Sequence, residues 1–199
     1  MASKDRILRL KEETRCNILE AAFRIVKEEG WQALSMRKIA EQIEYTAPII
    51  YEYFANKEAI LSELNKKGFI KLAAQMREAA ANANSPEDKM EAVWTAYWNF
   101  AFTEKELYRL MFGVTMNCCV EQKAPEIDCP EILVSELIES MLTSKENLES
   151  ETSRWYYTYW SIIHGLVSIN LVNRGGSEEI NRRILQDAIR GINRAILTQ

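Results

Sequence analysis

Glycine and proline are scarce in this chain of 199 residues, with 7 and 4 occurrences respectively. Both residue types interrupt helices, and the segments between them are rich in alanine, leucine, isoleucine, glutamate and lysine. No strongly alternating pattern of apolar and polar residues, bounded by turn signals, competes with helix. The composition therefore predicts an all-α protein, and its length suffices for one or two domains with a real core.

Long apolar runs are missing as well. The most apolar run, residues 162–172, is interrupted by His164 and Asn170 and is too short to span a bilayer. The first residues contain no uninterrupted apolar stretch of the kind that a secretory signal needs. Four cysteines without zinc-type spacing, in a chain without an export signal, are typical of a reducing compartment. We therefore expect a soluble, cytoplasmic protein with no membrane partner.

Signatures of catalysis and cofactor binding are also lacking. His164 is the only histidine, no glycine-rich phosphate loop occurs, and no nucleophile–histidine–acid set can be nominated. We therefore expect no enzyme, no cofactor and no metal site. The adjacent pair Cys118-Cys119 could serve as a thiol or heavy-metal sensor. Ordinary thiols are the favoured interpretation, because nothing nearby obviously lowers their pKa.

Charge is unevenly divided along the chain, whose net charge is −4. Residues 1–67 hold 12 Lys/Arg against 11 Asp/Glu, whereas residues 68–199 hold 13 against 18. This asymmetry suits an N-terminal part that faces DNA and an acidic remainder. The first ten residues, which include Lys4, Arg6 and Arg9, are expected to form a mobile basic arm. Such an arm either aids solubility or lies along DNA phosphates or in a minor groove.

Residues 34–61 predict two short helices joined by a tight turn, followed by the start of a third helix. Ser35 can cap the first helix, residues 36–43, and Thr46 can cap the second. Pro48 falls in the first turn of that second helix, where its missing amide hydrogen is tolerated. This is a helix-turn-helix arrangement, which places its second helix in the major groove of DNA.

Longer helices flank this unit. Residues 11–29 predict a helix that ends at Gly30 in a left-handed conformation, and Asn56 is expected to cap a long helix that runs to residue 83. Further helices are expected at residues 86–103, 105–112, 131–143, 149–173 and 178–197. We expect an N-terminal helix-turn-helix domain of residues 1–55 and a C-terminal helical domain of residues 56–199 for ligand binding and dimerisation.

The last two helices are joined by Arg174-Gly175-Gly176-Ser177, which predicts an antiparallel hairpin whose glycines end the first helix and whose serine caps the second. Both helices carry apolar surface wide enough to face two neighbours. A symmetric four-helix interface in a homodimer would cover it. The residues expected at this interface are Ile163, Val167, Leu171, Ile180, Ile184, Ala188, Ile192 and Ile196.

Aromatic side chains are concentrated on the helices of the C-terminal domain. Each could be ordinary core, but bulky aromatics and methionine from several helices are also what an apolar ligand site needs. His164 is either a hydrogen-bonded core histidine or a polar contact for a ligand. The candidate ligand-binding residues are Trp94, Tyr97, Trp98, Phe102, Tyr108, Met111, Tyr159, Trp160 and His164.

With these motifs placed, the chain resembles the tetracycline-repressor (TetR) family of transcriptional regulators. The resemblance is densest over residues 15–61 and includes Ser35-Met36-Arg37-Lys38-Ile39-Ala40, Ile50-Tyr51-x-Tyr53-Phe54 and Lys57-Glu58-x-Ile60-Leu61. The run Trp160-Ser161-Ile162-Ile163-His164-Gly165 is similar to a signature in one branch of the family's C-terminal domains.

The resemblance implies DNA contacts for Arg37, Thr46, Ala47, Pro48, Ile49, Tyr51, Tyr53 and Lys57. Tyr51, Tyr53 and Lys57 would contact phosphates. Arg37 and the residues 46–49 would lie near base edges. It further implies a homodimer on a palindromic double-stranded operator, and a repressor released by a small, largely apolar effector.

Two features of the helix-turn-helix favour an alternative. The family usually has glycine where Glu44 stands, and a left-handed glutamate costs about 1–2 kcal/mol. The head of the second helix, residues 46–49, is also apolar and offers few hydrogen bonds to bases. The alternative is a helical small-molecule-binding or enzymatic module with a vestigial helix-turn-helix.

Overall fold

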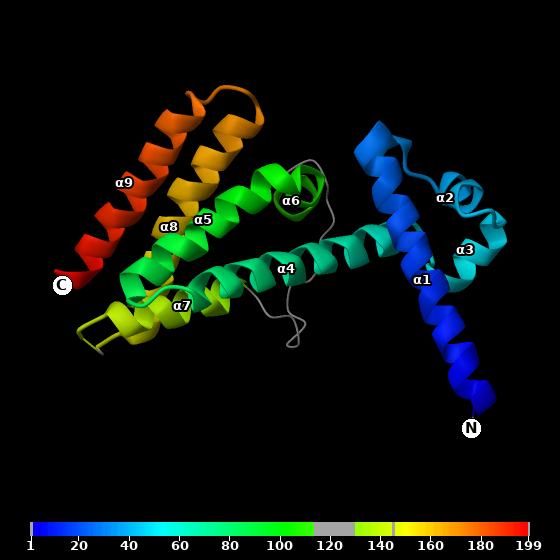
Figure 1. The fold of residues 1–199 in the computed structure, drawn as a ribbon, viewed down its shortest axis with the longest axis horizontal. Helices are drawn as coiled ribbons and strands as arrows, with labels where there is room; N and C mark the ends of the chain where they lie inside the picture. The colour runs from blue at the N-terminus through cyan, green and yellow to red at the C-terminus, as the bar shows by residue number, and fades with distance from the viewer. Residues whose placement is uncertain (1, 114–129, 145, 199) are drawn as a thin grey trace. The chain divides into compact units, whose positions relative to one another are not determined.

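The computed structural model describes residues 2–113, 130–144 and 146–198, and all the regular elements in those ranges are helical, so the all-α prediction is confirmed (Figure 1). The elements are α1 (Ala2–Glu29), the 3-10 turn η1 (Trp31–Ala33), α2 (Met36–Gln42), α3 (Ala47–Tyr53), α4 (Lys57–Ala81), α5 (Pro86–Thr103), α6 (Lys105–Phe112), α7 (Pro130–Met141), α8 (Leu148–Leu171) and α9 (Glu178–Leu197). Within the described ranges, none of these helices combines the length and the apolar character needed to cross a membrane.

The helices divide into two compact units. The described residues of Met1–Gly68 and Glu106–Ala124 form unit 1, and those of Phe69–Lys105 and Pro125–Gln199 form unit 2. Helix α4 contributes residues to both units, and α6 belongs almost wholly to unit 1 although it directly follows α5 of unit 2. The domain limits expected from the sequence, residues 1–55 and 56–199, remain a prediction.

Unit 1 is organised around aliphatic side chains from α1, α2, α3, the first half of α4, and α6. Fully buried members are Ile18, Ile25, Ile39, Ile50 and Ile60, one or two from each of the first four helices. Each buried side chain of this size contributes about 1.5–3 kcal/mol relative to leaving it in water. The short helices α2 and α3 are therefore held by tertiary packing, because helices of seven residues are not stable alone.

The N-terminal ten residues correct one expectation. Helix α1 begins at Ala2, so the predicted mobile arm is the first part of a helix of 28 residues. Residues 4–11 contain neither glycine nor proline, and leucine, arginine and lysine have high helix propensity. The side chains of Ile7, Leu8 and Leu10 are exposed in this segment, so propensity and continuity with the buried part of α1 maintain the helix here.

Gly30 ends α1, as predicted, but in a different conformation. Its φ is 84° and its ψ is 168°, which is outside the left-handed helical region and accessible essentially to glycine alone. The amide of Gly30 still donates to the carbonyl oxygen of Val26 at 2.9 Å, completing the last turn before the chain turns away.

Unit 2 comprises the second half of α4 together with α5, α7, α8 and α9. Its core holds the large side chains of Trp94, Tyr159, Ile163, Val167 and Ile189. Helices α8 and α9 pack side by side as an antiparallel pair, so the predicted hairpin is confirmed (Figure 1). Ser177 caps α9 as expected, because its Oγ accepts from the amide of Ile180 at 3.3 Å.

The end of α8 differs from the prediction. Asn173, with φ 56°, takes the left-handed position that we had expected a glycine to occupy. The amide of Asn173 donates to the carbonyl oxygen of Asn170 at 2.9 Å, and the amide of Arg174 donates to that of Ile169 at 3.0 Å. These two bonds form a Schellman motif, for which asparagine is the usual substitute for glycine.

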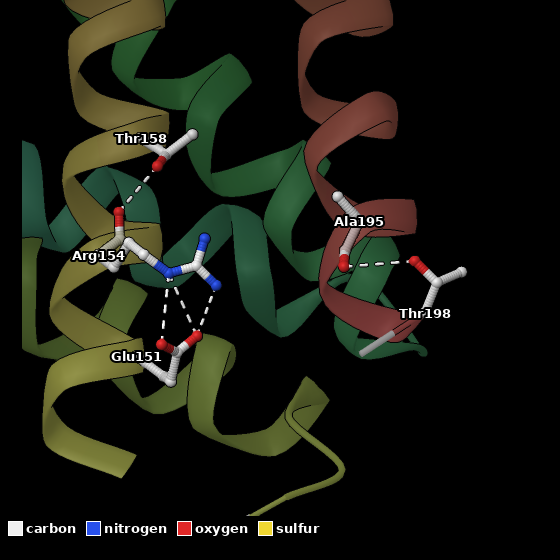
Figure 2. A network of polar contacts seen from close by, with 5 residues as sticks. All are labelled: Glu151, Arg154, Thr158, Ala195 and Thr198. Carbon is white, nitrogen blue, oxygen red and sulfur yellow. Dashed lines mark hydrogen bonds and ion pairs between the residues drawn. The ribbon is translucent and has the colours of Figure 1, made fainter. Parts of the chain in front are cut away.

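Polar side chains on the outer faces of this hairpin bond mainly within their own helix. Figure 2 shows Glu151, Arg154 and Thr158 on α8, and Ala195 and Thr198 at the end of α9. The Nε of Arg154 lies 3.2 Å from Oε2 of Glu151, and the hydroxyl of Thr158 donates to the carbonyl oxygen of Arg154 at 2.8 Å. Exposed contacts of this kind contribute at most about 1 kcal/mol each. The stability of the hairpin therefore comes from its buried face.

Candidate DNA-binding and ligand-binding sites

The first helix of the helix-turn-helix begins and ends with specific polar contacts. Oγ of Ser35 accepts from the amide of Lys38 at 3.2 Å, which confirms the predicted cap. At the other end, the amide of Tyr45 donates to the carbonyl oxygen of Ala40 at 2.9 Å, and Glu44 has a φ of 58°. This is a Schellman motif with glutamate in the left-handed position. The predicted left-handed Glu44 is therefore confirmed.

Helix α3 is anchored on one side and open on the other. Thr46 takes the N-cap backbone conformation, but its side chain makes no capping hydrogen bond, so that prediction is only half right. Ile50 is fully buried and fixes the helix to the core. Thr46, Pro48 and Tyr51 are exposed, whereas Ala47, Ile49 and Tyr53 are half-buried. An unobstructed helix face of this kind can enter a major groove.

The two predicted cationic contacts, Arg37 and Lys57, each have a protein partner. The Nε of Arg37 lies 2.8 Å from Oε1 of Glu41 in an exposed pair. The Nζ of Lys57 donates to the carbonyl oxygen of Trp31 at 3.1 Å. An ammonium has three hydrogens, so this bond positions Lys57 at the start of α4 and leaves two hydrogens for an anion. The N-terminus of a helix itself favours an anion.

Two further cations lie beside Tyr53. Lys11 and Arg15 of α1 line a surface hollow of about 240 Å³ together with Tyr53 and two glutamates. Arg15 is held there by an ion pair with Glu63 at 2.9 Å, and its guanidinium lies 4.9 Å from the ring centre of Phe54. Our prediction omitted both cations. The signal available in the sequence was their spacing, because residues four apart share one face of a helix.

In unit 2, α5 and α8 bring together Trp94, Tyr97, Tyr159, Trp160 and His164, which we call the aromatic cluster. The rings of Trp94 and Tyr159 stack with centres 5.7 Å apart, and Tyr97 meets Trp94 edge-on at 5.4 Å. The ring of Trp160 stacks on His164 at 5.0 Å. The hydroxyl oxygen of Tyr97 lies 3.1 Å from Nδ1 of His164 and links the two sets of rings, so five of the nine predicted ligand-binding residues form one contiguous group.

The polar atoms of the aromatic cluster are uncharged near neutral pH. Burial lowers the pKa of His164 and raises that of Tyr159, whose hydroxyl donates to Oδ1 of Asn193. The buried Nε1 of Trp94 has no hydrogen-bond acceptor among the described residues. The cluster thus combines aromatic surface with an unused donor.

The remaining four ligand-binding candidates lie elsewhere. Phe102 is 40% exposed, and its ring lies 4.7 Å from that of Trp98, one turn earlier on α5. Tyr108 and Met111 belong to unit 1, where both are buried; Met111 lies against Gly68 of α4. The spacing of aromatic residues along a helix could not predict which of them join the aromatic cluster, because aromatic side chains pack equally well in the core of either unit.

The residues predicted at the dimer interface differ in their exposure to solvent. The side chains of Ile163, Val167, Ile192 and Ile196 are buried inside unit 2. Leu171 and Ala188 are half-buried, whereas Ile180 and Ile184 are exposed. The reason is geometric: positions four residues apart advance about 40° around a helix, so a long stripe with this spacing passes from one face to another. Other exposed apolar side chains of the hairpin are Ile162, Ile169 and Val172.

The pair Cys118-Cys119 lies outside the described residues. The alternatives stated for its role, a sensor or ordinary thiols, therefore remain open predictions.

Comparisons with family models and with curated proteins match this chain to transcriptional regulators. The family model for bacterial regulatory proteins of the tetR family matches residues 18–64. The model for the tetracyclin repressor-like C-terminal domain matches residues 90–191. The transcriptional activator FasR of Mycolicibacterium smegmatis is 21% identical over 161 residues, which cover 81% of this chain and 70% of FasR. The transcriptional regulator BetI of Burkholderia thailandensis is 24% identical over 57% of this chain and 70% of BetI.

Solved structures of similar fold cover nearly the whole chain. A protein of unknown function from Rhodococcus sp. RHA1 matches with a TM-score of 0.76 and 19% identity over 92% of this chain and 95% of the other. FadR of Thermus thermophilus, a TetR-family repressor solved with lauroyl-CoA, matches with a TM-score of 0.59 and 18% identity over 89% and 92%. Because the family models together match both the helix-turn-helix and most of unit 2, this chain belongs to the TetR family of DNA-binding transcriptional regulators.

Proposed function

We propose that this protein is a ligand-responsive repressor, a homodimer that binds a palindromic operator and releases it when a small, largely apolar effector binds. The observation that carries the proposal is the open face of α3. Ile50 anchors this helix in a well-packed core, and Thr46, Pro48 and Tyr51 remain exposed to solvent. Two such units in a dimer would meet successive major grooves about 34–36 Å apart.

The DNA contacts fall into two groups in this proposal. Tyr51, Tyr53 and Lys57 contact phosphates and fix the register on any sequence. Lys11 and Arg15, which line the hollow beside Tyr53 together with two glutamates, are further candidates for phosphate contact. Arg37 and the residues 46–49 meet base edges, where Ala47, Pro48 and Ile49 offer apolar contact to thymine methyl groups. Arg37 must exchange Glu41 for DNA, which is inexpensive because exposed ion pairs contribute at most about 1 kcal/mol.

The aromatic cluster is the proposed effector site. Its stacked rings supply apolar surface, and Nε1 of Trp94 offers a donor for one polar atom of the ligand. The lauroyl-CoA bound by the structural relative FadR is consistent with a largely apolar effector. Both Tyr159 and His164 are neutral in the folded protein, so the site selects by shape and hydrogen bonding rather than by charge.

The dimer interface is proposed on the exposed apolar face of the hairpin. Its members are Ile162, Ile169 and Val172 at the end of α8 and Ile180 and Ile184 at the start of α9. An isologous two-fold contact covers such a face with the same face of a second chain. This proposal keeps Ile180 and Ile184 of the sequence prediction and leaves out the four residues that are buried within unit 2.

Coupling between effector and DNA would pass through α4 and α6. Helix α4 is continuous from Lys57 to Ala81, about 37 Å at 1.5 Å per residue, and takes part in both units. Glu104, which caps the end of α5, pairs with Lys71 of α4 at 2.6 Å, immediately before α6 begins. An effector that binds the released form more tightly shifts these helices and weakens DNA binding.

A salt titration of duplex binding tests the DNA-binding part. Duplexes from the region upstream of the protein's own gene should bind more tightly than shuffled duplexes, with log K falling steeply as log salt rises. Lys57→Ala should weaken binding several-fold and reduce the salt slope by about 1. Lys105→Ala, an exposed lysine at the start of α6, is the matched control. Equal binding to upstream and shuffled duplexes would instead favour the module with a vestigial helix-turn-helix.

Transcription from the upstream region in a purified system tests repression. The curated relative FasR is an activator and the structural relative FadR is a repressor, so both directions occur among similar proteins. Addition of the protein should lower transcript yield if the proposal is correct, and a raised yield would identify an activator.

A further inference from the structure

A groove on the surface of unit 2 is separate from the aromatic cluster in its lining residues. It has a volume of about 430 Å³ and is lined by the C-terminal turns of α5, the last turn of α8 and the first turns of α9. Ligand pockets in proteins begin at about 300 Å³, so this groove is large enough for a small bicyclic molecule.

One wall of the groove is aromatic. Trp98 and Phe102 lie one turn apart on α5, with ring centres 4.7 Å apart and planes inclined at 48°. Phe102 is 40% exposed, so part of its ring faces solvent. The exposed ring area offers a flat molecule a stacking surface.

The part of the lining contributed by α9 includes a buried carboxamide whose orientation is fixed. Asn181 of α9 is only 5% exposed and lines the groove. Its Nδ2 donates to Oδ1 of Asn170 at 2.6 Å and to the carbonyl oxygen of Gly176 at 2.9 Å, which uses both amide hydrogens. Asn170 is itself fixed, because its Nδ2 donates to the carbonyl oxygen of Leu166 at 2.8 Å.

This arrangement leaves Oδ1 of Asn181 without a hydrogen-bond donor among the described residues. An amide oxygen without a protein donor, on a residue that is only 5% exposed and lines a groove, marks a position where a ligand can supply the donor. The amide cannot reverse without loss, because its oxygen would then face two acceptors, Oδ1 of Asn170 and the carbonyl oxygen of Gly176, and both hydrogen bonds would be lost.

The two charged residues that line the groove neutralise each other. Glu178 and Arg182 form an ion pair, with Oε1 and Nη2 2.9 Å apart, one turn apart on α9. Neither a cationic nor an anionic ligand gains from a net local charge here. The chemistry therefore favours a neutral molecule.

We propose that this groove binds a small, neutral, planar heteroaromatic molecule that carries an N–H donor. The ring lies against Trp98 and Phe102, and the N–H donates to Oδ1 of Asn181. The site is a second ligand site in unit 2, and it requires neither the aromatic cluster nor DNA.

Indole and benzofuran are a matched pair of probes, because they have nearly the same shape and only indole has an N–H. Each is titrated into the full-length protein labelled with ¹⁵N-asparagine, and the side-chain amide signals are followed by NMR. Indole should bind at least about five-fold more tightly than benzofuran and should shift the Asn181 amide signals. Equal affinities, or an unshifted Asn181, would overturn the proposal.

Phe102→Ala locates the site without disturbing the core, because this ring is partly exposed. It should weaken indole binding at least about five-fold, whereas Phe102→Tyr should retain it. Ile132→Ala, on a half-exposed apolar side chain of α7 in the same unit, should leave binding unchanged and serves as control. Unchanged indole binding in Phe102→Ala would place indole at another site, such as the aromatic cluster, and would contradict the assignment.

Discussion

The hydroxyl oxygen of Tyr97 lies 3.1 Å from Nδ1 of His164, and this contact joins α5 to α8 inside unit 2. The two residues are 67 positions apart in the sequence. The ring of His164 also stacks on that of Trp160, so the imidazole is held by a polar contact at its edge and by a ring contact on its face. A neutral imidazole fits this setting, because the surrounding aromatic side chains offer no charge to balance a proton.

The first prediction concerns acid. Burial lowers the pKa of His164 in the folded protein, whereas in the unfolded chain it stays near its ordinary value of about 6.5. As the pH falls through about 6.5, the unfolded chain therefore takes up the proton first and the free energy of unfolding decreases. The decrease continues until the pH passes the lower folded pKa, where it levels off.

His164→Gln should remove this decrease, because glutamine does not titrate. The measurement is urea unfolding between about pH 5 and pH 8, expressed as the difference between the two proteins so that contributions of the carboxylates cancel. His164 is the only histidine, so no other imidazole contributes to the difference. A difference that stays constant across this range would contradict the lowered pKa.

The second prediction concerns the turn of the helix-turn-helix. Glu44 has a φ of 58°, where a Cβ is unfavourable and glycine is not penalised. Glu44→Gly should raise the free energy of unfolding by about 1 kcal/mol. Glu44→Ala keeps the Cβ and should raise the free energy of unfolding much less. Equal stabilisation by the two changes would assign the effect to the carboxylate charge instead.

The same two variants separate charge from strain in DNA binding. Both remove a carboxylate from the turn that precedes the DNA-facing helix, so both should bind operator duplex more tightly at low salt. This increase in affinity should become smaller as the salt concentration is raised, because salt screens the charge. If only Glu44→Gly binds more tightly, backbone strain rather than charge limits the interaction.

Much of the fold could be read from local signals in the sequence. Ser35, Asn56, Ser85 and Ser177 each accept a capping hydrogen bond at the expected helix start, because a cap depends only on residues within one turn. Thr46 does not, although its backbone has the cap conformation. For the same local reason, the limits of α5, α6 and α9 agree closely with their patterns.

Tertiary placement could not be read in the same way. The residue pattern of α6 predicts a helix. It does not predict that Leu110 of this helix joins the core of unit 1. The four-residue repeat on α9 shows apolar positions, but not which of them face inward. Those properties depend on which helices lie alongside, and an isolated stripe carries no such information.

The third prediction uses that distinction. Ile184 is 45% exposed and Ile192 is 7% exposed on the same helix. Ile184→Glu should give a folded monomer, because the carboxylate is tolerated in water but not in an apolar contact between chains. Ile192→Glu should lower the free energy of unfolding by more than about 2 kcal/mol, because it buries an unpaired carboxylate inside unit 2.

Analytical ultracentrifugation and far-UV circular dichroism distinguish the two outcomes. A dimeric Ile184→Glu would place the interface elsewhere. A fully stable Ile192→Glu would contradict the burial of that side chain.

The last prediction concerns the loop between α8 and α9. A Cβ on Gly175 would lie 1.9 Å from Oδ1 of Asn170, which is held by its bond to Asn181. Gly175→Ala must therefore displace the Asn170 carboxamide and break that bond, at a cost of about 1–3 kcal/mol in the free energy of unfolding. The requirement for glycine here is space, since a methyl group and an amide oxygen cannot share the position.

A double-mutant cycle checks this origin. Asn170→Ala removes the obstacle, so Gly175→Ala should cost almost nothing more when added to it. Gly165→Ala is a useful control, because a Cβ at that position meets nothing within 4 Å. If Gly175→Ala is equally costly with and without Asn170, the loop backbone rather than the carboxamide sets the requirement for glycine.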